Sequence, residues 1–482
     1  MQHIKKVKFN TKSVSNNSLL NGMSKNTAKT LTKNGAVTYK KSGSELLDFF
    51  AQAGAMRNNK DEALKLFQKA FSQDKLLAIK ILFYLRDVRG GQGERDLFRN
   101  CLEWLGTDYP EVFESIVKFV PEYGRWDDLF FDNENCFDFI REQLTNDINS
   151  EKPSLMAKWL PTINASSKST VSKARFMANK LGLSEIAYRK NLRDIRKKIK
   201  IVESQMSARE WNKINYSTVP SQASRIYKNA FLKHDNTRYS KFIDKAEKCE
   251  VKINASTLYP YQIYKSVQSD YSKTLEALWN QLPDYTQGNN ALVVADVSGS
   301  MSGDPMSVSV SLALYFAERN KGQFKNHFIT FSGNPELQKI QGNTLREKMR
   351  NLENAEWGMN TNLQAVFDLI LETANENETS ADEMPSTIYI ISDMEFDSCC
   401  RNHTNFDVIK AKYQKAGYKL PNIVFWNVNA SGKNVPVRHT ENGIALVSGF
   451  SPSVFKIAVE NKTPEQVMLD VINSERYSQI KI

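Results

Sequence analysis

Residues 289–320 read NNALVVADVSGSMSGDPMSVSVSLALYFAERN and decide the fold of the surrounding segment. The apolar run at 292–294 has no polar alternation, which is typical of a central parallel strand covered by helices on both faces. The run ends at Asp296, and Ser298 and Ser300 follow at alternate positions before an amphipathic helix. Ligands of open α/β sheets bind at the carboxyl ends of the strands. These three side chains therefore offer one charged and two neutral oxygens to a small hard cation.

Two distant segments complete a known pattern. Thr361 lies in EWGMNTNLQAVFDLIL, a loop leading into a helix, and Asp393 ends the buried strand of STIYIISDMEFD. Asp-x-Ser-x-Ser with a distant Thr and a distant Asp resembles the metal-ion-dependent adhesion site of von Willebrand factor A domains. The resemblance implies one divalent cation, Mg²⁺ in a cytoplasm, coordinated by Ser298, Ser300 and Thr361, with Asp296 and Asp393 holding its waters. The alternative is that Asp and Ser only cap the next helix.

A cation held by so few direct carboxylates stays electrophilic. It can accept an Asp or Glu from outside, so a partner protein that supplies an acidic ligand is expected. The expected rim of this docking site is Met301, Ser302, Asp304, Asn360 and Glu395. Asp304 and Glu395 could instead satisfy the metal from within, and the sequence leaves both alternatives open.

The part of the chain before this stretch predicts helices. SELLDFFAQAGAM, DEALKLFQKAFS and DKLLAIKILFYLRD carry apolar residues at three- and four-residue spacing, separated by short breaks. No strand-like segment follows until Ala291, which favours a HEAT-like series of helical hairpins. RDVRGGQGERD (86–96) lacks a preceding strand and a GKS, so a salt-bridged turn is favoured over a phosphate cradle.

The expected organisation has three parts. Residues 1–40 are rich in Ser, Asn, Thr and Lys without periodicity and are expected to form a flexible or surface-draped arm. Residues 41–285 are expected to form the all-α helical-repeat domain. Residues 286–482 are expected to form an α/β doubly wound domain, because strand patterns such as FKNHFITFS, STIYIIS and PNIVFWNVN alternate with helical ones.

Charge is distributed unevenly along the chain. The net charge is +11, but residues 1–290 hold 47 basic against 32 acidic residues, whereas residues 291–482 hold 18 against 22. Residues 151–250 alone hold 22 basic against 9 acidic residues. A basic segment inside a folded helical region predicts a surface that binds a polyanion, most often nucleic acid.

The helix of AYRKNLRDIRKKIKIVESQM has one apolar stripe and a basic arc beside it. Tyr188, Trp211, Tyr216 and Tyr227 are interspersed with the basic residues of this region. Basic groups supply salt-dependent phosphate contacts and aromatic rings supply base stacking. A purely solvated basic face is the alternative. The candidate RNA-binding residues are Lys173, Arg175, Lys180, Arg189, Lys190, Arg193, Arg196, Lys197, Lys200, Arg225, Lys228, Lys233 and Arg238.

A second resemblance covers the chain from about Thr32 onward. MSAREWNKINYSTVPSQASRIYKNAFLKHDNTRYSKFI and KINASTLYPYQIY resemble the TROVE helical domain of the Ro autoantigen family, joined to a von Willebrand A domain. FITFSGNP, WGMNTN, SDMEFD and NIVFWNV are most similar to the Ro-like group known as domain of unknown function 2828. The resemblance implies a ring of helical repeats closed by the A domain. It also implies binding of small structured RNAs on the outside and of single-stranded ends of misfolded RNAs through the hole.

Three functions remain open. The favoured one is a non-catalytic RNA-binding scaffold, an RNA chaperone or quality-control protein, with a metal-dependent docking face. The others are a protein adaptor without RNA binding and a metal-dependent nuclease, which is disfavoured because the site is hydroxyl-rich and lacks an evident general base. A monomer is expected. No apolar run approaches the roughly 20 residues of a membrane-spanning helix, and the N-terminus lacks a secretory signal, so a cytoplasmic location without membrane contact is expected.

Overall fold

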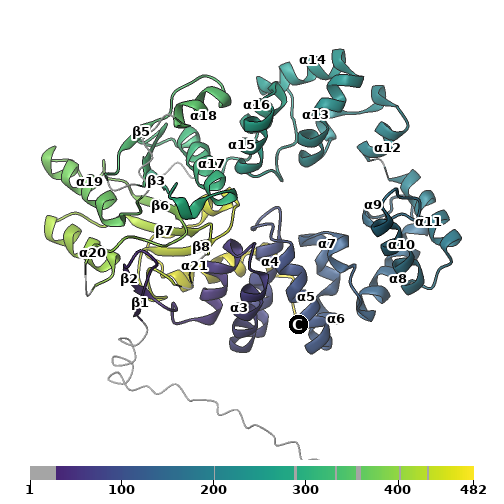
Figure 1. The fold of residues 1–482 in the computed structure, drawn as a ribbon, viewed down its shortest axis with the longest axis horizontal. Coiled ribbons are helices and arrows are strands. Elements are labelled where there is room, and N and C mark those ends of the chain that lie inside the picture. Colours follow the sequence, from purple (N-terminus) through teal and green to yellow (C-terminus); the bar gives the residue numbers. More distant parts are fainter. Residues whose placement is uncertain are drawn as a thin grey trace, which may run out of the picture.

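The computed structural model describes residues 29–199, 201–286, 290–331, 334–353, 360–400, 403–430, 432 and 434–482. The chain forms a long series of helices followed by a separate domain built on a mostly parallel sheet (Figure 1). The expectation of a helical part joined to an α/β domain is confirmed at this level. Among the described residues, no helix combines the length and the apolar character needed to cross a membrane.

The helical part runs along the chain from Glu45 to Asn280. Its α-helices are α2 (Glu45–Gln52), α3 (Lys60–Gln73), α4 (Lys75–Arg86), α5 (Asp96–Asp108), α6 (Pro110–Ile116), α7 (Val120–Tyr123), α8 (Glu134–Asn149), α9 (Met156–Trp159), α10 (Lys168–Lys180), α11 (Glu185–Lys198), α12 (Val202–Ser207), α13 (Ser221–His234), α14 (Asn236–Glu247), α15 (Pro260–Ser269) and α16 (Lys273–Asn280). Short 3₁₀ turns join them at Ala53–Ala55, Val117–Phe119, Trp126–Leu129, Trp211–Lys213 and Tyr216–Thr218.

Side-chain caps and apolar stripes explain these helices. Asn59 and Asp74 accept the backbone N–H groups that open α3 and α4, so each helix begins at a defined residue. Phe67 and Phe71 lie one turn apart on the same face of α3, and both meet the edge of Trp104 from α5. Consecutive helices therefore pack through one apolar stripe each.

The turn at residues 86–96 is held by ion pairs, as its sequence predicted. Arg86 pairs with Asp128 at 2.7 Å in the protein interior. Glu94 accepts a hydrogen bond from Nε of Arg57 at 2.7 Å, and Asp87 binds Arg476 near the C-terminus. These pairs join the 86–96 turn to three other segments of the chain.

The sheet domain has six strands in the order β5-β4-β3-β6-β7-β8. All neighbours are parallel except the edge strand β5, which is antiparallel to β4. The elements are β3 (Ala291–Ala295), α17 (Asp304–Arg319), β4 (His327–Thr330), β5 (Leu337–Lys339), α18 (Leu345–Glu353), α19 (Leu363–Glu376), β6 (Thr387–Ser392), α20 (Asn405–Ala416), β7 (Asn422–Asn427), β8 (Ile444–Ser448) and α21 (Pro464–Ile472), with 3₁₀ turns at Gly299–Met301, Pro452–Lys456 and Glu475–Tyr477.

Both faces of this sheet are covered. Phe316 of α17 and Phe455 pack on Tyr389 of β6. Phe367 of α19 and Tyr413 of α20 pack on each other in a separate layer, and Figure 1 shows α19 and α20 on the side of the sheet away from α17. Every residue of β3 and β6 is buried, which explains why their sequences are continuous apolar runs.

The arm expected over residues 1–40 was flexible or surface-draped; its described part, residues 29–39, forms a hairpin that lies on the surface of the sheet domain. Its strands, β1 (Lys29–Leu31) and β2 (Val37–Tyr39), pair antiparallel. Gly35, at φ +85°, allows the tight turn between them. The hairpin is bound along the sheet domain, where Tyr39 exchanges backbone hydrogen bonds of 3.1 and 2.9 Å with Val435. Residues 1–28 lie outside the described part of the chain.

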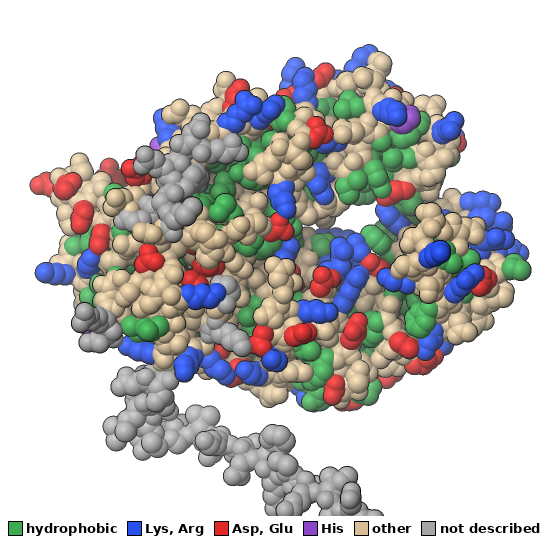
Figure 2. Space-filling view, viewed as in Figure 1, with side chains coloured by type: hydrophobic (Ala, Val, Ile, Leu, Met, Phe, Trp, Pro, Cys, Tyr) green, Lys and Arg blue, Asp and Glu red, His purple; other side chains and the backbone are tan. Residues whose placement is uncertain are grey.

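Both ends of the helical part contact the sheet domain, so the molecule is a ring. At one end α2 packs on β8 and α21, and at the other end α15 packs along α17. Figure 1 shows the remaining helices curving between these two contacts, and Figure 2 shows an opening through the middle of the molecule.

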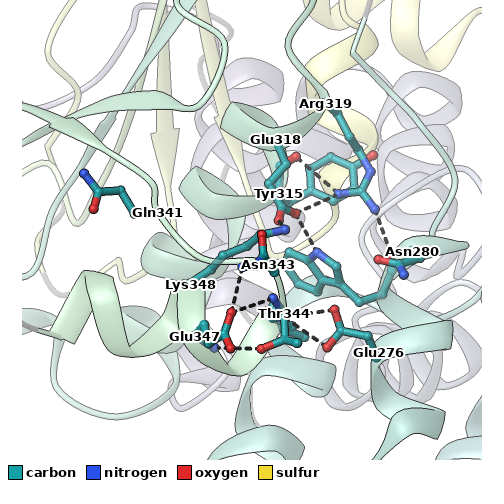
Figure 3. A network of polar contacts seen from close by, with 12 residues as sticks. Glu276, Asn280, Tyr315, Glu318, Arg319, Gln341, Asn343, Thr344, Glu347 and Lys348 are labelled. Atoms are coloured by element: carbon teal, nitrogen blue, oxygen red, sulfur yellow. Dashed lines mark hydrogen bonds and ion pairs between the residues drawn. The ribbon is translucent and has the colours of Figure 1, made fainter. Parts of the chain in front are cut away.

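A polar network closes the ring between α16, α17 and α18 (Figure 3). Nε1 of Trp279 donates to a carboxylate oxygen of Glu318 at 2.6 Å, and the other oxygen accepts from Lys348 at 2.6 Å. Glu276 accepts the backbone N–H of Leu345 at 2.9 Å. Because Trp279 and Glu276 are buried, this contact is a packed interface.

Candidate metal site and basic surfaces

Adjacent strands bring the acidic residues of the predicted metal site together. β3 and β6 are parallel neighbours, and Asp296 and Asp393 are the first residues after their respective ends. Oδ1 of Asp296 accepts the backbone N–H of Ser298 at 2.8 Å, and Oδ2 accepts the hydroxyl of Ser392 at 2.6 Å. The Ser298 and Ser300 hydroxyls lie 3.1 Å apart. The loop of residues 296–300, the metal loop, therefore folds back on the end of β3.

Thr361 reaches the same edge of the sheet from the loop before α19. Its Oγ1 donates to the backbone carbonyl of Glu395 at 2.9 Å. The backbone N–H of Glu395 in turn donates to Oδ1 of Asp393 at 3.1 Å. Thr361 and Asp393 are thus joined through one intervening residue, and both are almost completely buried.

Among the described residues, no Lys or Arg side chain forms an ion pair with the carboxylates of Asp296 and Asp393. Burial, aided by the Asp393 carboxylate and opposed by hydrogen bonds from Ser392 and Ser298, raises the pKa of Asp296 to about 6. Oδ2 of Asp393 is buried and has no hydrogen-bond partner in the described structure. A small divalent cation would satisfy that oxygen and favour the ionised carboxylates, so these residues fit Mg²⁺.

A metal site built from clustered His, Cys, Asp or Glu side chains has no support in the described ranges. They contain no group of three or more His, Cys, Asp or Glu side chains able to hold a metal ion.

The expected rim is only partly exposed. Ser302 and Asn360 are exposed, whereas Met301 is buried and does not lie on an open rim. Glu395 is also buried, and an inward position was one of the two alternatives that the sequence left open for it. Glu395 is held inward because its carboxylate accepts the backbone N–H of Lys33 at 2.6 Å and the amide of Asn434 at 2.9 Å. Asp304, the fifth residue of the expected rim, forms an ion pair with Lys265 of α15.

Several predicted RNA-binding residues serve the fold instead. Arg196 donates to the carbonyls of Ala157 and Leu160 at 2.8 and 2.7 Å. Lys228 is buried and pairs with Asp270 at 2.6 Å. Two more arginines act similarly: Arg225 binds Gln222 and Ser266, and Arg238 binds the carbonyls of Trp211, Asn212 and Ile214. These side chains hold neighbouring segments of the helical part together, and their assignment to an RNA surface stays a prediction.

Three other predicted residues form surface ion pairs. The pairs are Arg175 with Glu185, Lys180 with Asp132, and Arg193 with Asp194. Exposed pairs of this kind contribute little to stability and exchange partners readily, so these cations remain available to an anion.

The remaining predicted residues are exposed cations without a hydrogen bond or ion pair to any described residue; they are Lys173, Arg189, Lys190, Lys197 and Lys233. Lys200 lies outside the described residues. Of the predicted aromatic residues, Tyr188 and Tyr216 are buried in the core and cannot stack on a base.

Five predicted residues share one groove. This α11 groove, of 1060 Å³, lies between α11 and the α12 region, and its basic lining consists of Arg189, Lys190, Arg193, Arg196, Lys197 and Lys213. The other predicted residues that the structure describes do not line it.

A second basic hollow was not predicted. This inner hollow, of 750 Å³, is lined from the α4–α5 turn, α9, α12, α13 and the start of α15, which lie around the ring opening. Its basic and aromatic lining includes Arg57, Arg86, Arg95, Arg125, Lys158, Trp159, Tyr227 and Tyr261. Figure 2 shows Lys and Arg side chains gathered around the opening.

Arg95 is the most distinctive residue of the inner hollow. Its exposed side chain makes no hydrogen bond or ion pair with the described residues. Partial burial of its guanidinium, together with the nearby guanidinium groups of Arg125, Arg86 and Arg99, lowers its pKa, and the Asp127 carboxylate opposes this shift. The Arg125 guanidinium lies 4.0 Å above the ring of Trp159. Arginine therefore meets aromatic surface here, and one cation is left without a counterion.

Comparison with known proteins assigns the family. The model of the family described as Domain of unknown function (DUF2828) matches residues 32–121 and 137–295, and that of Domain of unknown function (DUF7788) matches residues 290–480. The chain belongs to the DUF2828 family. It is also 31% identical to uncharacterized protein L728 of Acanthamoeba polyphaga mimivirus over 497 aligned residues, which cover 92% of this chain and 86% of the relative.

Proposed function

We propose that this protein is a non-catalytic cytoplasmic RNA-binding scaffold, with a role in RNA quality control similar to that of Ro. In this proposal the helical ring is of the HEAT-like TROVE type, and the sheet domain is a von Willebrand A-like domain that closes it. The single observation that carries the proposal is Arg95, an unpaired arginine among other arginines at the ring opening.

A phosphate group is the ligand that would suit this position. Its negative charge would offset the repulsion among the guanidinium groups around Arg95, which adds to the effect of burial in lowering the pKa of that side chain. Tyr227, Tyr261 and Trp159 of the same hollow offer ring surface on which bases can stack. Alternating phosphate and base contacts are what a single RNA strand requires.

The α11 groove supports contact with a second, more extended part of an RNA. Its exposed cations, Arg189, Lys190 and Lys197, follow one helix and bind no described residue. Cations in this arrangement contact phosphates without reading a sequence, so structured RNAs of different sequence would be accepted.

The metal site would dock a partner protein. Ser298, Ser300 and Thr361 would coordinate Mg²⁺, while Asp296 and Asp393 would hold its waters. When bound, the cation supplies a position for an acidic side chain of the partner. Ser300 and Ser302 are exposed, so this approach is open from the side of the metal loop. The hydroxyl-rich site supports a docking role rather than catalysis.

The RNA proposal is tested by fluorescence anisotropy with a labelled single-stranded RNA. Arg95→Glu reverses one charge in the inner hollow, and Lys415→Glu reverses one exposed charge on the sheet domain as the matched control. We expect Arg95→Glu to weaken binding about tenfold or more and to reduce the slope of log K against log salt by about 0.7, the contribution of one phosphate contact. Equal affinities for both variants and the wild type would exclude the inner hollow as an RNA site.

A further inference from the structure

The hairpin at residues 29–39 lies directly against the edge of the sheet domain that carries the metal site. The Thr32 hydroxyl donates to the carbonyl of Phe396 at 2.7 Å. Gly35 forms a β-bridge with Asp397. The turn between these two residues, Lys33 and Asn34, is therefore held over the loop that follows Asp393.

Asn34 contacts a predicted metal ligand. Its side-chain Nδ2 donates to Oγ1 of Thr361 at 3.1 Å and to the carbonyl of Glu395 at 2.7 Å. The Glu395 carbonyl can only accept, so it fixes which side of the Asn34 amide faces this edge.

The hydroxyl of Thr361 has one hydrogen and two lone pairs. Its hydrogen points to the Glu395 carbonyl at 2.9 Å, with Asp397 Oδ1 as a second acceptor at 3.2 Å. Asn34 donates into one lone pair. One lone pair remains, and the hydroxyl can no longer rotate freely to present it elsewhere.

We propose that Asn34 is a positioning residue of the cation site, which makes the N-terminal hairpin a part of that site. Asn34 does not coordinate the metal itself. It orients the Thr361 hydroxyl so that the free lone pair is available to the cation, in the way that outer residues orient the ligands of other metal sites. This inference rests on the proposed metal site.

The contact has a reciprocal consequence. If the docked hairpin raises the affinity for the cation by a given factor, the bound cation must favour docking of the hairpin by the same factor. Mg²⁺ should therefore slow amide hydrogen exchange in the turn, including the N–H of Gly35, which donates to the Thr32 carbonyl at 3.0 Å.

The test measures Mg²⁺ binding to the full chain by isothermal titration calorimetry. Asn34→Ala removes the contact with Thr361. Thr38→Val is the matched control, because it removes a 2.8 Å hydrogen bond from the same hairpin to Val435, away from the metal edge. Asn34 is exposed, so its replacement should leave the metal-free protein folded, which urea titration without metal verifies.

We expect Asn34→Ala to weaken Mg²⁺ binding about 10- to 100-fold and to abolish the Mg²⁺-dependent slowing of exchange in the turn. Thr38→Val should change the affinity less than about threefold. If the wild type binds Mg²⁺ and Asn34→Ala binds it equally well, the inference is overturned while the metal site stands. If the wild type binds no Mg²⁺, the proposed metal site fails and the inference fails with it.

Discussion

Lowering the pH should remove the stabilisation that Mg²⁺ gives this protein. Burial raises the pKa of Asp296 from 3.8 to about 6, a shift of roughly two units, which corresponds to about 3 kcal/mol. Because the pKa is raised in the folded state, the stabilising contribution of this group to the metal-free protein is fully present below about pH 4. It is lost as the pH rises through about 6. A bound cation would favour the ionised carboxylate and offset that loss at neutral pH.

Urea titrations with and without Mg²⁺, at about pH 5 and about pH 7, measure this effect. We expect Mg²⁺ to raise the free energy of unfolding clearly at the higher pH and much less at the lower one, where it must displace a proton from Asp296. Asp296→Asn should make the metal-free protein more stable at neutral pH, by up to about 3 kcal/mol, and should remove the Mg²⁺ response. Equal stabilisation by Mg²⁺ at both pH values would refute the assignment of Asp296 to the metal site.

Three further predictions concern the ring. Trp279→Ala should lower the free energy of unfolding by about 3–5 kcal/mol in urea titrations, since it empties a buried position at the ring closure; a loss below about 1 kcal/mol would contradict the packed interface. Arg86→Leu should lower the free energy of unfolding by about 3 kcal/mol in the same titrations, because the buried carboxylate of Asp128 loses one of its partners. An unchanged free energy of unfolding would mean that the pair is not buried in solution. Reversing the charges of Arg189 and Lys190 should reduce the slope of log K for RNA binding against log salt by about 1.4, while leaving the urea midpoint unchanged. An unaltered slope would show that the α11 groove does not contact the RNA.

The sheet domain was predictable because its signals are local. The uninterrupted apolar run of β3 ends at Asp296, and that of β6 ends at Asp393. Strands buried on both faces are parallel neighbours in sheets of this type, so the two carboxylates were expected at one edge. The same reasoning cannot reach Asn34, which meets Thr361 across 327 residues of sequence.

The hairpin itself had a usable signal. LTKNGAVTY has strand-forming residues on both sides of Asn34-Gly35, namely Thr32 before it and Val37, Thr38 and Tyr39 after it, and Asn-Gly is a strong indicator of a tight hairpin turn. Residues 1–40 as a whole are rich in Ser, Asn, Thr and Lys, and this composition favours disorder more strongly than the short hairpin signal favours a strand.

The basic surface was predicted only as a region. A run of arginines and lysines indicates net charge, but it does not show which side chains the fold uses. Arg196 bonds to carbonyls almost 40 residues upstream, whereas Arg189, two turns earlier in α11, forms no hydrogen bond or ion pair with a described residue. Arg57, Arg95 and Arg125 are tens of residues apart in the sequence, and packing around the α4–α5 turn, where Arg57 pairs with Glu94 and Arg125 with Asp127, brings them to one hollow.

The most direct test of RNA binding is to purify the protein without nuclease at low salt and to sequence the RNA that remains bound. We predict that RNA co-purifies with the wild type, that high salt releases it, and that Arg95→Glu retains less of it than Lys415→Glu. Absence of RNA from the wild type even at low salt would contradict the account. The helical ring would then serve protein contacts alone, with the metal edge as its docking face.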